Sequence, residues 1–355
     1  MIEARGLTKR FGEKTAVDDA SFTVEPGRVT GFLGPNGAGK STTMRMILGL
    51  DHPSAGTVTV AGVRYAGLGA PLHQVGALLD AKAVHGGRSA HNHLLCLARS
   101  NGIPTRRVDA VLELVGLHSV ERKPAKGFSL GMGQRLGIAG ALLGDPAVLM
   151  FDEPVNGLDP EGILWIRTLM RTLAAEGRTV FVSSHLMSEM ALTADHLVVI
   201  GRGRILADTS VREFIETNAH SHVRVRSPQV AELGPLLARR HWRVEVDPDG
   251  SLRVFGSDPA SIGDLAAEHG VRLHELSPVQ PSLEEAFMRL TGDTVEYHAG
   301  GLHNHDAEPP AAEEVLGEPP EGPPPGGPPP GSPPDEGPSG PPPSGPTGMW
   351  EGGRS

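Results

Sequence analysis

Apolar residues along the first 215 positions follow two spacings. Runs such as AVLMF (147–151) and HLVVI (196–200) are almost entirely apolar and have the length of buried strands. By contrast, LWIRTLMRTLAAEG (164–177) repeats its apolar residues at the period of an amphipathic helix. Buried strands that alternate with amphipathic helices are typical of an α/β domain with a largely parallel sheet. The pattern therefore predicts this architecture for residues 1–215.

The start of the chain has a different pattern. MIEARGLTKRF (1–11) and ASFTVEPG (20–27) alternate apolar and polar residues and lie on either side of a turn-like segment. Such alternation is typical of strands with one buried face. The sequence predicts a small N-terminal antiparallel β subdomain built from short strands.

Residues 221–297 predict a separate small α+β domain. Strand-like HVRVRS (222–227) is followed by a helical segment, two strands around a DPDG turn, a second helix and the strand-like VRLHELS (271–277). This β-α-β-β-α-β order is that of the ferredoxin-like fold. A last helix is expected to begin at Ser282, with Glu285 three residues later as in a capping box.

Residues 299–355 have the composition of a disordered tail. After Gly301 there are 17 prolines, nine acidic residues and few large apolar side chains. Such a segment buries too little apolar surface to offset the entropy lost on ordering. The sequence predicts a solvated tail, with docking to a partner as the alternative.

Charge and hydropathy limit the class of protein. The formal net charge is −10, and the nine acids and one arginine of residues 301–355 leave only −2 for the rest. The nearly neutral body gives no sign of a nucleic-acid-binding surface. The N-terminus lacks the apolar segment of a signal peptide, no run reaches the length of a membrane span, and Cys96 is the only cysteine. We expect a cytoplasmic protein.

A glycine-rich stretch follows the strand-like VTGFL (29–33). GPNGAGKST (34–42) has the spacing G-x-x-x-x-G-K-[ST] and leads into a helical pattern, as a phosphate-binding loop requires. Its backbone N–H groups are expected to point at phosphates. The predicted nucleotide-binding residues are Gly34, Pro35, Asn36, Gly37, Ala38, Gly39, Lys40, Ser41 and Thr42. Lys40 would reach the β- and γ-phosphates, and the Ser41 hydroxyl would bind Mg²⁺.

An apolar run, VLMFDEP (148–154), ends in two acidic residues. At the tip of a buried strand, Asp152 is the Mg²⁺-linked carboxylate expected of a P-loop NTPase. Glu153 is then the candidate general base for the attacking water. By itself such a pair is common and is explained by a helix cap or by solvation. Its combination with the loop at 34–42 favours ATP hydrolysis.

With these motifs the chain resembles the ATP-binding cassette ATPases, the nucleotide-binding subunits of ABC transporters. FSLGMGQRL (128–136) stands where that family has its Leu-Ser-Gly-Gly-Gln signature, NGLDP (156–160) resembles the D-loop, and VFVSSHLMSEM (180–190) resembles the switch strand. The resemblance covers about residues 2–215. It implies a P-loop NTPase core with a helical subdomain at about 85–140.

The resemblance also implies roles for further residues. Phe11 would stack on adenine, and His185 would contact the γ-phosphate and help to orient it. In the family two cassettes face each other head to tail with two ATP molecules between them. Ser129 and Gly131 would therefore contact ATP held by the opposite protomer, and Asp159 would belong to the D-loop.

Two departures from the family pattern stand out. Asp80 lies 40 residues after Lys40, where the family usually has a glutamine that contacts Mg²⁺ and the attacking water and couples to the permease. Asp80 retains an oxygen ligand for Mg²⁺ but adds a charge, and we interpret it as a variant. In the signature, Leu130 and Met132 replace the first glycine and the glutamine.

Partners and location follow from the resemblance. The expected partners are a second copy of the chain, or a homologous cassette, and a separately encoded membrane permease. The expected location is the inner face of the cell membrane. LSPVQPSLEEAFMRLTGD (276–293) resembles the accessory segment of the drug- and peptide-export branch. Two alternatives are a cassette ATPase acting on ribosomes or DNA, and a nucleotide sensor without turnover. The single cassette without a heptad insertion argues against the first, and Glu153 with His185 against the second.

Overall fold

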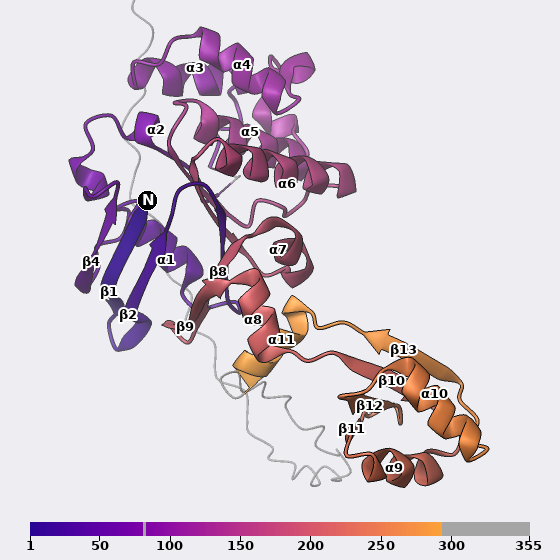
Figure 1. Cartoon of the computed structure of the whole chain (residues 1–355). Helices are drawn as coiled ribbons and strands as arrows, with labels where there is room; N and C mark the ends of the chain where they lie inside the picture. Colours follow the sequence, from indigo (N-terminus) through magenta and orange to yellow (C-terminus); the bar gives the residue numbers. More distant parts are fainter. Residues whose placement is uncertain (81–82, 293–355) are drawn as a thin grey trace, which may run out of the picture. The chain divides into compact units, whose positions relative to one another are not determined.

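The computed structural model describes residues 1–80 and 83–292, and its largest sheet has six strands in the order β5-β6-β7-β3-β8-β9 (Figure 1). The first five run parallel, and β9 pairs antiparallel with β8 at one edge. This confirms the predicted α/β architecture. In chain order the strands are β3 (Val29–Leu33), β5 (Val75–Leu78), β6 (Val148–Asp152), β7 (Thr179–Ser184), β8 (His196–Gly201) and β9 (Arg204–Ser210).

The central strands are apolar throughout because both faces of the sheet are covered. All residues of β3 and β7 are buried. On β6, Val148 and Met150 join one hydrophobic core, whereas Leu149 and Phe151 join the other. Successive side chains of a strand point to opposite faces, so an uninterrupted apolar run is what a doubly covered parallel strand requires.

Helices pack against both faces of this sheet. One core contains residues of the larger helices, and α3, α4 and α5 contact one another as a helical subdomain (Figure 1). The helices are α1 (Lys40–Ile47), α2 (Pro71–Gln74), α3 (Ala90–Ser100), α4 (Arg106–Leu114), α5 (Leu130–Leu142), α6 (Pro160–Ala175), α7 (Met187–Thr193) and α8 (Val211–Asn218). Short 3₁₀ helices cover Tyr65–Gly67, His118–Val120 and Ala125–Gly127.

The N-terminal strands form a separate antiparallel sheet in the order β2-β1-β4. They are β1 (Ile2–Phe11), β2 (Lys14–Val24) and β4 (Ala55–Val60). The antiparallel arrangement was predicted, but β1 and β2 are 10 and 11 residues long rather than short. Phe22 of this sheet stacks on Phe32 and Phe181 of the large sheet, with ring centroids 5.7 and 5.9 Å away. The aromatic cluster joins the two sheets across one core.

The small C-terminal sheet has the order β11-β12-β10-β13, antiparallel throughout. Its elements are β10 (His222–Arg226), α9 (Val230–Arg239), β11 (Arg243–Val246), β12 (Leu252–Phe255), α10 (Pro259–Glu268) and β13 (Glu275–Val279). The predicted β-α-β-β-α-β order is confirmed. The last strand begins at Glu275 rather than at Val271, because its five residues pair with the five residues of β10.

The final helix, α11 (Leu283–Gly292), packs against α8 and α7. As expected it begins after Ser282, whose hydroxyl accepts a hydrogen bond from the Glu285 N–H at 3.1 Å. Leu283, Ala286 and Phe287 are buried in the same core as the large helices, not in that of the small sheet. The sequence grouped this helix with the small domain. The predicted tail at 299–355 lies outside the described residues.

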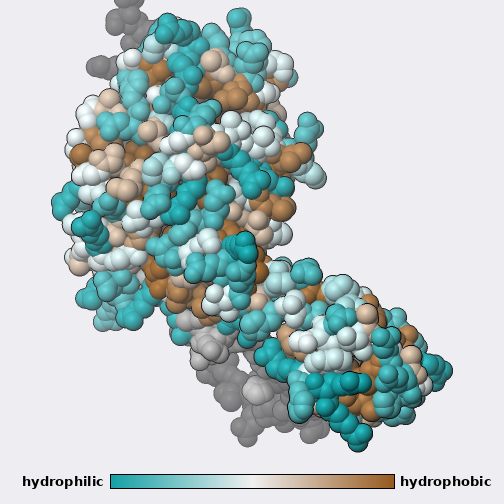
Figure 2. All heavy atoms as spheres, viewed as in Figure 1, coloured by the Kyte–Doolittle hydropathy of each residue, from teal (hydrophilic) through white to brown (hydrophobic). Residues whose placement is uncertain are grey.

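Polar and apolar residues are interspersed over the face drawn in Figure 2. None of the helices within residues 1–80 and 83–292 is both long enough and apolar enough to cross a membrane.

Candidate active site

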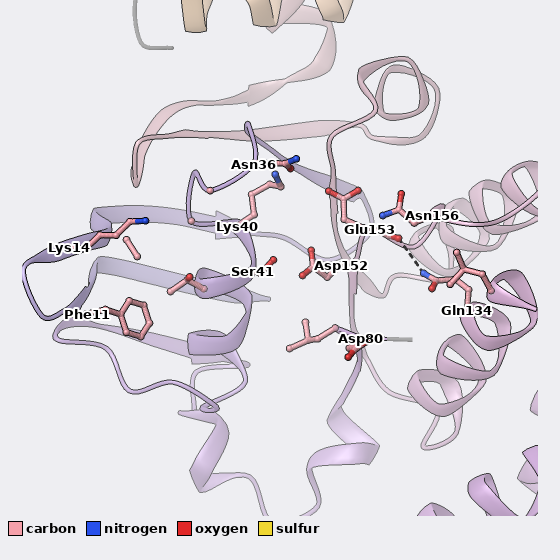
Figure 3. A pocket seen from close by; sticks show the side chains of 16 residues that line it. Phe11, Lys14, Asn36, Lys40, Ser41, Asp80, Gln134, Asp152, Glu153 and Asn156 are labelled. Atoms are coloured by element: carbon pink, nitrogen blue, oxygen red, sulfur yellow. Dashed lines mark hydrogen bonds between the residues drawn. The ribbon is translucent and has the colours of Figure 1, made fainter. Parts of the chain in front are cut away.

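A pocket of about 580 Å³ lies where β3 and β6 end (Figure 3). It collects side chains from the N-terminal sheet, the loop before α1, the segment after β5, helix α5 and the segment after β6. Predicted residues that line it are Phe11, Asn36, Gly37, Gly39, Lys40, Ser41, Thr42, Asp80, Asp152 and Glu153. The other lining residues, to which the sequence analysis gave no role at the site, are Lys14, Ala16, Leu79, Leu130, Gln134 and Asn156.

At two positions of the loop before α1, only glycine fits the backbone and its surroundings. At Gly39, φ is +110°, and a Cβ atom would stand 2.6 Å from the Ala16 carbonyl oxygen. At Gly34 a Cβ atom would stand 2.3 Å from the Ile200 carbonyl oxygen. Gly39 directly precedes α1, so the first N–H groups of that helix face the pocket without a capping side chain. Such a helix start, with its positive dipole end, favours an anion.

Lys40 supplies the positive charge at the base of the pocket. Its ammonium group donates to the carbonyl oxygens of Gly34 at 2.6 Å and Pro35 at 3.3 Å, and the residue is only 7% exposed. Burial lowers the pKa of Lys40, while the carboxylates of Glu153 and Asp152 oppose that shift. The loop thus holds a buried cation beside the helix start and close to two acids.

The two acids at the end of β6 are held by Ser183 of β7. The Ser183 hydroxyl donates to the Asp152 carboxylate and accepts from the Glu153 N–H at 3.1 Å. Ser183 is fully buried. The sequence analysis missed this residue, although a Ser-Ser pair at the end of an otherwise apolar strand is a signal for it. Ser183 fixes both acids relative to the sheet.

Glu153 has an unusual backbone and lies beside a histidine. Its φ is +51°, a left-handed conformation that costs a non-glycine residue about 1–3 kcal/mol. Its carboxylate lies 2.7 Å from Nδ1 of His185, at the end of the switch strand β7. Strain of this kind is found where the surrounding structure demands it, and active sites are the commonest place. The predicted base and the predicted histidine are therefore in direct contact.

Comparisons with known proteins agree on one family. A family model described as "ABC transporter" matches residues 17–156. The bacitracin transport ATP-binding protein of Bacillus licheniformis is 35% identical over 82% of this chain and 97% of its own length. The Nod factor export ATP-binding protein I of Rhizobium sp. (strain N33) is 36% identical over 83% of this chain and 98% of its own length.

The chain belongs to the ATP-binding subunits of ABC transporters. Subunits of this family bind and hydrolyse ATP. A solved ATP-binding subunit of an ABC transporter matches with a TM-score of 0.56 and 27% identity, covering 61% of this chain and 92% of that structure. Residues 221–284 match a separate domain of unknown function, in the region of the ferredoxin-like sheet.

Several residues implied by the cassette resemblance lie outside this chain's own pocket lining. Ser129 is exposed and caps α5, where its hydroxyl accepts from the Met132 N–H at 3.2 Å. Gly131 lies in the first turn of that helix. Asp159 caps α6, where its carboxylate accepts from the Gly162 N–H at 2.9 Å. The other predicted loop residues outside the lining are Gly34, Pro35 and Ala38.

One residue of the cassette's signature helix was overlooked entirely. The sequence analysis assigned residues 128–136 to the signature and did not single out Gln134. Its side chain points to the pocket and donates a hydrogen bond to the Glu153 carbonyl oxygen (Figure 3). The available signal was a lone amide among small and apolar residues.

Proposed function

We propose that this subunit uses ATP hydrolysis to drive a separate membrane permease in the direction of export. The observation that carries the proposal is one pocket in which Lys40, Ser41, Asp152 and Glu153 lie together. A helix start, a buried cation, oxygen ligands and a base are the parts that phosphoryl transfer to water needs.

Binding of the nucleotide is assigned to one side of the pocket. Phe11 is half exposed at the end of β1, with the Lys9 ammonium 4.9 Å from the centre of its ring. We assign a face of this ring to stacking on adenine. Lys40 would turn its ammonium from the loop carbonyls to the β- and γ-phosphates. The backbone N–H groups from Gly37 to Thr42 would surround the same phosphates, with Asn36 at the rim.

The donor set suits Mg²⁺. The Ser41 hydroxyl and the Asp152 and Asp80 carboxylates all line the pocket. Mg²⁺ prefers oxygen ligands and is held by one or two carboxylates together with phosphates and water. We assign Ser41 and Asp152 to the ion, with Asp80 as the third candidate. When bound, the ion would neutralise charge on the β- and γ-phosphates.

Hydrolysis is assigned to Glu153 and His185. The Glu153 carboxylate would accept a proton from the attacking water, and His185 would orient both the carboxylate and the γ-phosphate. Their 2.7 Å contact supports this pairing.

A second cassette completes the site in our proposal. Ser129 is exposed at the start of α5, and the amides that follow it suit an anion. Because Ser129 does not line this chain's pocket, its proposed ligand is the γ-phosphate held by the opposite protomer. Gly131 and the D-loop residue Asp159 would lie at the same dimer interface. ATP bound by both protomers would favour the closed pair.

The permease is assigned to another polypeptide, with this subunit at the inner face of the membrane. Relatives named for bacitracin transport and Nod factor export support an export role. The test is ATP hydrolysis by the subunit co-expressed with a candidate permease, a membrane protein of about six spans sought in the neighbouring reading frames. We expect co-purification and a turnover rate that changes with the permease. A subunit that co-purifies instead with ribosomes or DNA, at an unchanged rate, contradicts the transport role.

Removal of Mg²⁺ is expected to stop turnover. Excess EDTA should abolish ATP hydrolysis by the purified subunit, because the phosphate charge is then uncompensated, and excess MgCl₂ should restore it. The rate of phosphate release is measured with EDTA present and again after MgCl₂ is added. Asp152→Asn should stay slow at the MgCl₂ concentration that restores the wild type. Undiminished hydrolysis in EDTA would refute the assignment of the ion.

Asp80→Ala is expected to lower kcat about fivefold, the effect of one net hydrogen bond of ~1 kcal/mol. The reason is the loss of a carboxylate that lines the pocket and would supply an oxygen to bound Mg²⁺ and the attacking water. Asp80→Gln should bind ATP normally and retain more activity than the alanine variant, because it keeps an oxygen there. Steady-state ATPase assays on both variants make the comparison. Full ATPase and transport activity in Asp80→Ala would show that the position has no coupling role.

A further inference from the structure

The main chain of Glu153 is fixed by contacts to two separate elements. On one side, its N–H donates to the Ser183 carbonyl oxygen at 3.2 Å and to the Ser183 hydroxyl on β7. On the other side, its carbonyl oxygen accepts from the Asn156 N–H at 3.2 Å, which closes the turn after β6. Glu153 has a left-handed φ of +51°, and its carboxylate lies 2.7 Å from Nδ1 of His185. The backbone of this residue thus decides where its carboxylate points.

Gln134 makes a further contact to the same carbonyl oxygen. Its side-chain Nε2 donates to the Glu153 oxygen at 3.2 Å, as the dashed line in Figure 3 shows. Gln134 is 4% exposed. A buried amide that loses its acceptor is costly, so this contact constrains both residues.

Helix α5 connects this contact to the signature. Ser129 caps the helix, and Gln134 follows five residues later on the same rigid element. A displacement of the helix start therefore moves the Gln134 amide with it. Helix α5 therefore links Glu153, the proposed base of this chain's own site, to Ser129, which we assign to the ATP held by the opposite protomer.

We propose that Gln134 is a positioning residue for the base: its amide holds the Glu153 carbonyl oxygen and couples the orientation of the carboxylate to the position of α5. The inference rests on the proposed role of Glu153 as base. Gln134 itself touches neither water nor phosphate in this assignment, so its removal should slow the hydrolytic step and leave nucleotide affinity intact.

The test is Gln134→Met, which preserves length and volume but removes the donor. We expect kcat to fall about 10- to 100-fold, the size of effect that a small misplacement of a reacting group produces, with KM for ATP changed less than about twofold. Equilibrium binding of a fluorescent ATP analogue should match the wild type. Amide hydrogen exchange should increase at Asn156, in the turn after β6, because its acceptor is no longer fixed, and it should stay unchanged in the strands of the large sheet.

Arg107→Met is the matched control, because it also removes side-chain bonds to main-chain carbonyl oxygens, here those of Leu142 at 3.0 Å and Leu143 at 3.4 Å at the opposite end of α5. It also removes the ion pair of Arg107 with Asp145, which lies beyond that end of the helix. It should keep kcat within about twofold of wild type, since its contact does not reach the base. Gln134→Leu serves as a second variant that lacks the amide donor and adds no charge, and it should reproduce the loss of kcat if the methionine variant folds poorly.

Two outcomes would overturn the inference. If Gln134→Met has full kcat while Glu153→Gln is inactive, the proposed role of Gln134 is refuted and the proposed role of Glu153 as base still stands. In the Glu153→Gln background, Gln134→Met should reduce the residual turnover no further, because the group it positions is already lost. An additive loss would show that Gln134 acts elsewhere. Wild-type turnover in Glu153→Gln would instead refute the proposed base itself.

Discussion

Glu153→Gln is expected to lower kcat for ATP hydrolysis by about 100- to 10,000-fold, the range that a positioned general base contributes. Glutamine has the shape of glutamate but accepts no proton from the attacking water. The left-handed backbone and the contacts of Glu153 to Ser183 and Gln134 involve only main-chain atoms of residue 153, so they should survive the substitution. ATP affinity should therefore remain near that of the wild type.

The same variant should accumulate as an ATP-bound dimer, because the closed pair forms but does not reset by hydrolysis. Phosphate release gives the rate, and size-exclusion chromatography with ATP gives the dimer. Glu113→Gln, an exposed substitution on α4, is the control for a surface glutamate and should behave as wild type. Wild-type turnover by Glu153→Gln would remove this residue from the role of base.

Lys40→Ala is expected to weaken ATP binding directly, by about 10- to 150-fold, because a hydrogen bond to a charged group is worth ~1.5–3 kcal/mol. Lys40 is the buried cation of the chain's own loop, so the loss should appear in isolated monomers as well as in dimers. Equilibrium binding of a fluorescent ATP analogue, at concentrations that keep the protein monomeric, measures the effect. Lys123→Ala, on the exposed surface of the helical subdomain, should bind as wild type.

Ser129→Arg is expected to have the opposite profile. Monomers should bind ATP almost as tightly as wild type, because Ser129 does not line their pocket. In the Glu153→Gln background the variant should fail to form the ATP-dependent dimer, since the arginine fills the space that the opposite γ-phosphate would enter. Loss of the hydroxyl also removes the N-cap of α5, which costs about 0.5–2 kcal/mol of stability.

Ser210→Arg provides the control for that lost cap. Ser210 caps α8 in the same way, with its hydroxyl accepting from the Glu213 N–H at 3.1 Å. This variant should lose comparable stability and still form the dimer. If Ser129→Arg abolishes binding in monomers as Lys40→Ala does, Ser129 belongs to the chain's own pocket, and the proposal of a shared site is wrong.

The sequence by itself determined the parts of the site that are contiguous. Residues 34–42 carry their geometry locally, since the glycines permit the turn and the following helix presents its N–H groups. Asp152 and Glu153 are placed by the apolar run before them, because a buried parallel strand must end at the edge of the sheet where loops begin. The β-α-β-β-α-β order was likewise predictable from turns and periodicity within residues 221–297.

The tertiary structure alone decided which distant residues reach the pocket. Gln134 and Ser183 hold Glu153 from a helix 19 residues before it and a strand 30 residues after it, and no local pattern specifies such pairs. Helix α11 has an ordinary amphipathic sequence, yet its apolar face lies in the core of the large helices. Periodicity shows that a face must be buried but not which partner buries it. That choice depends on how all the elements pack together.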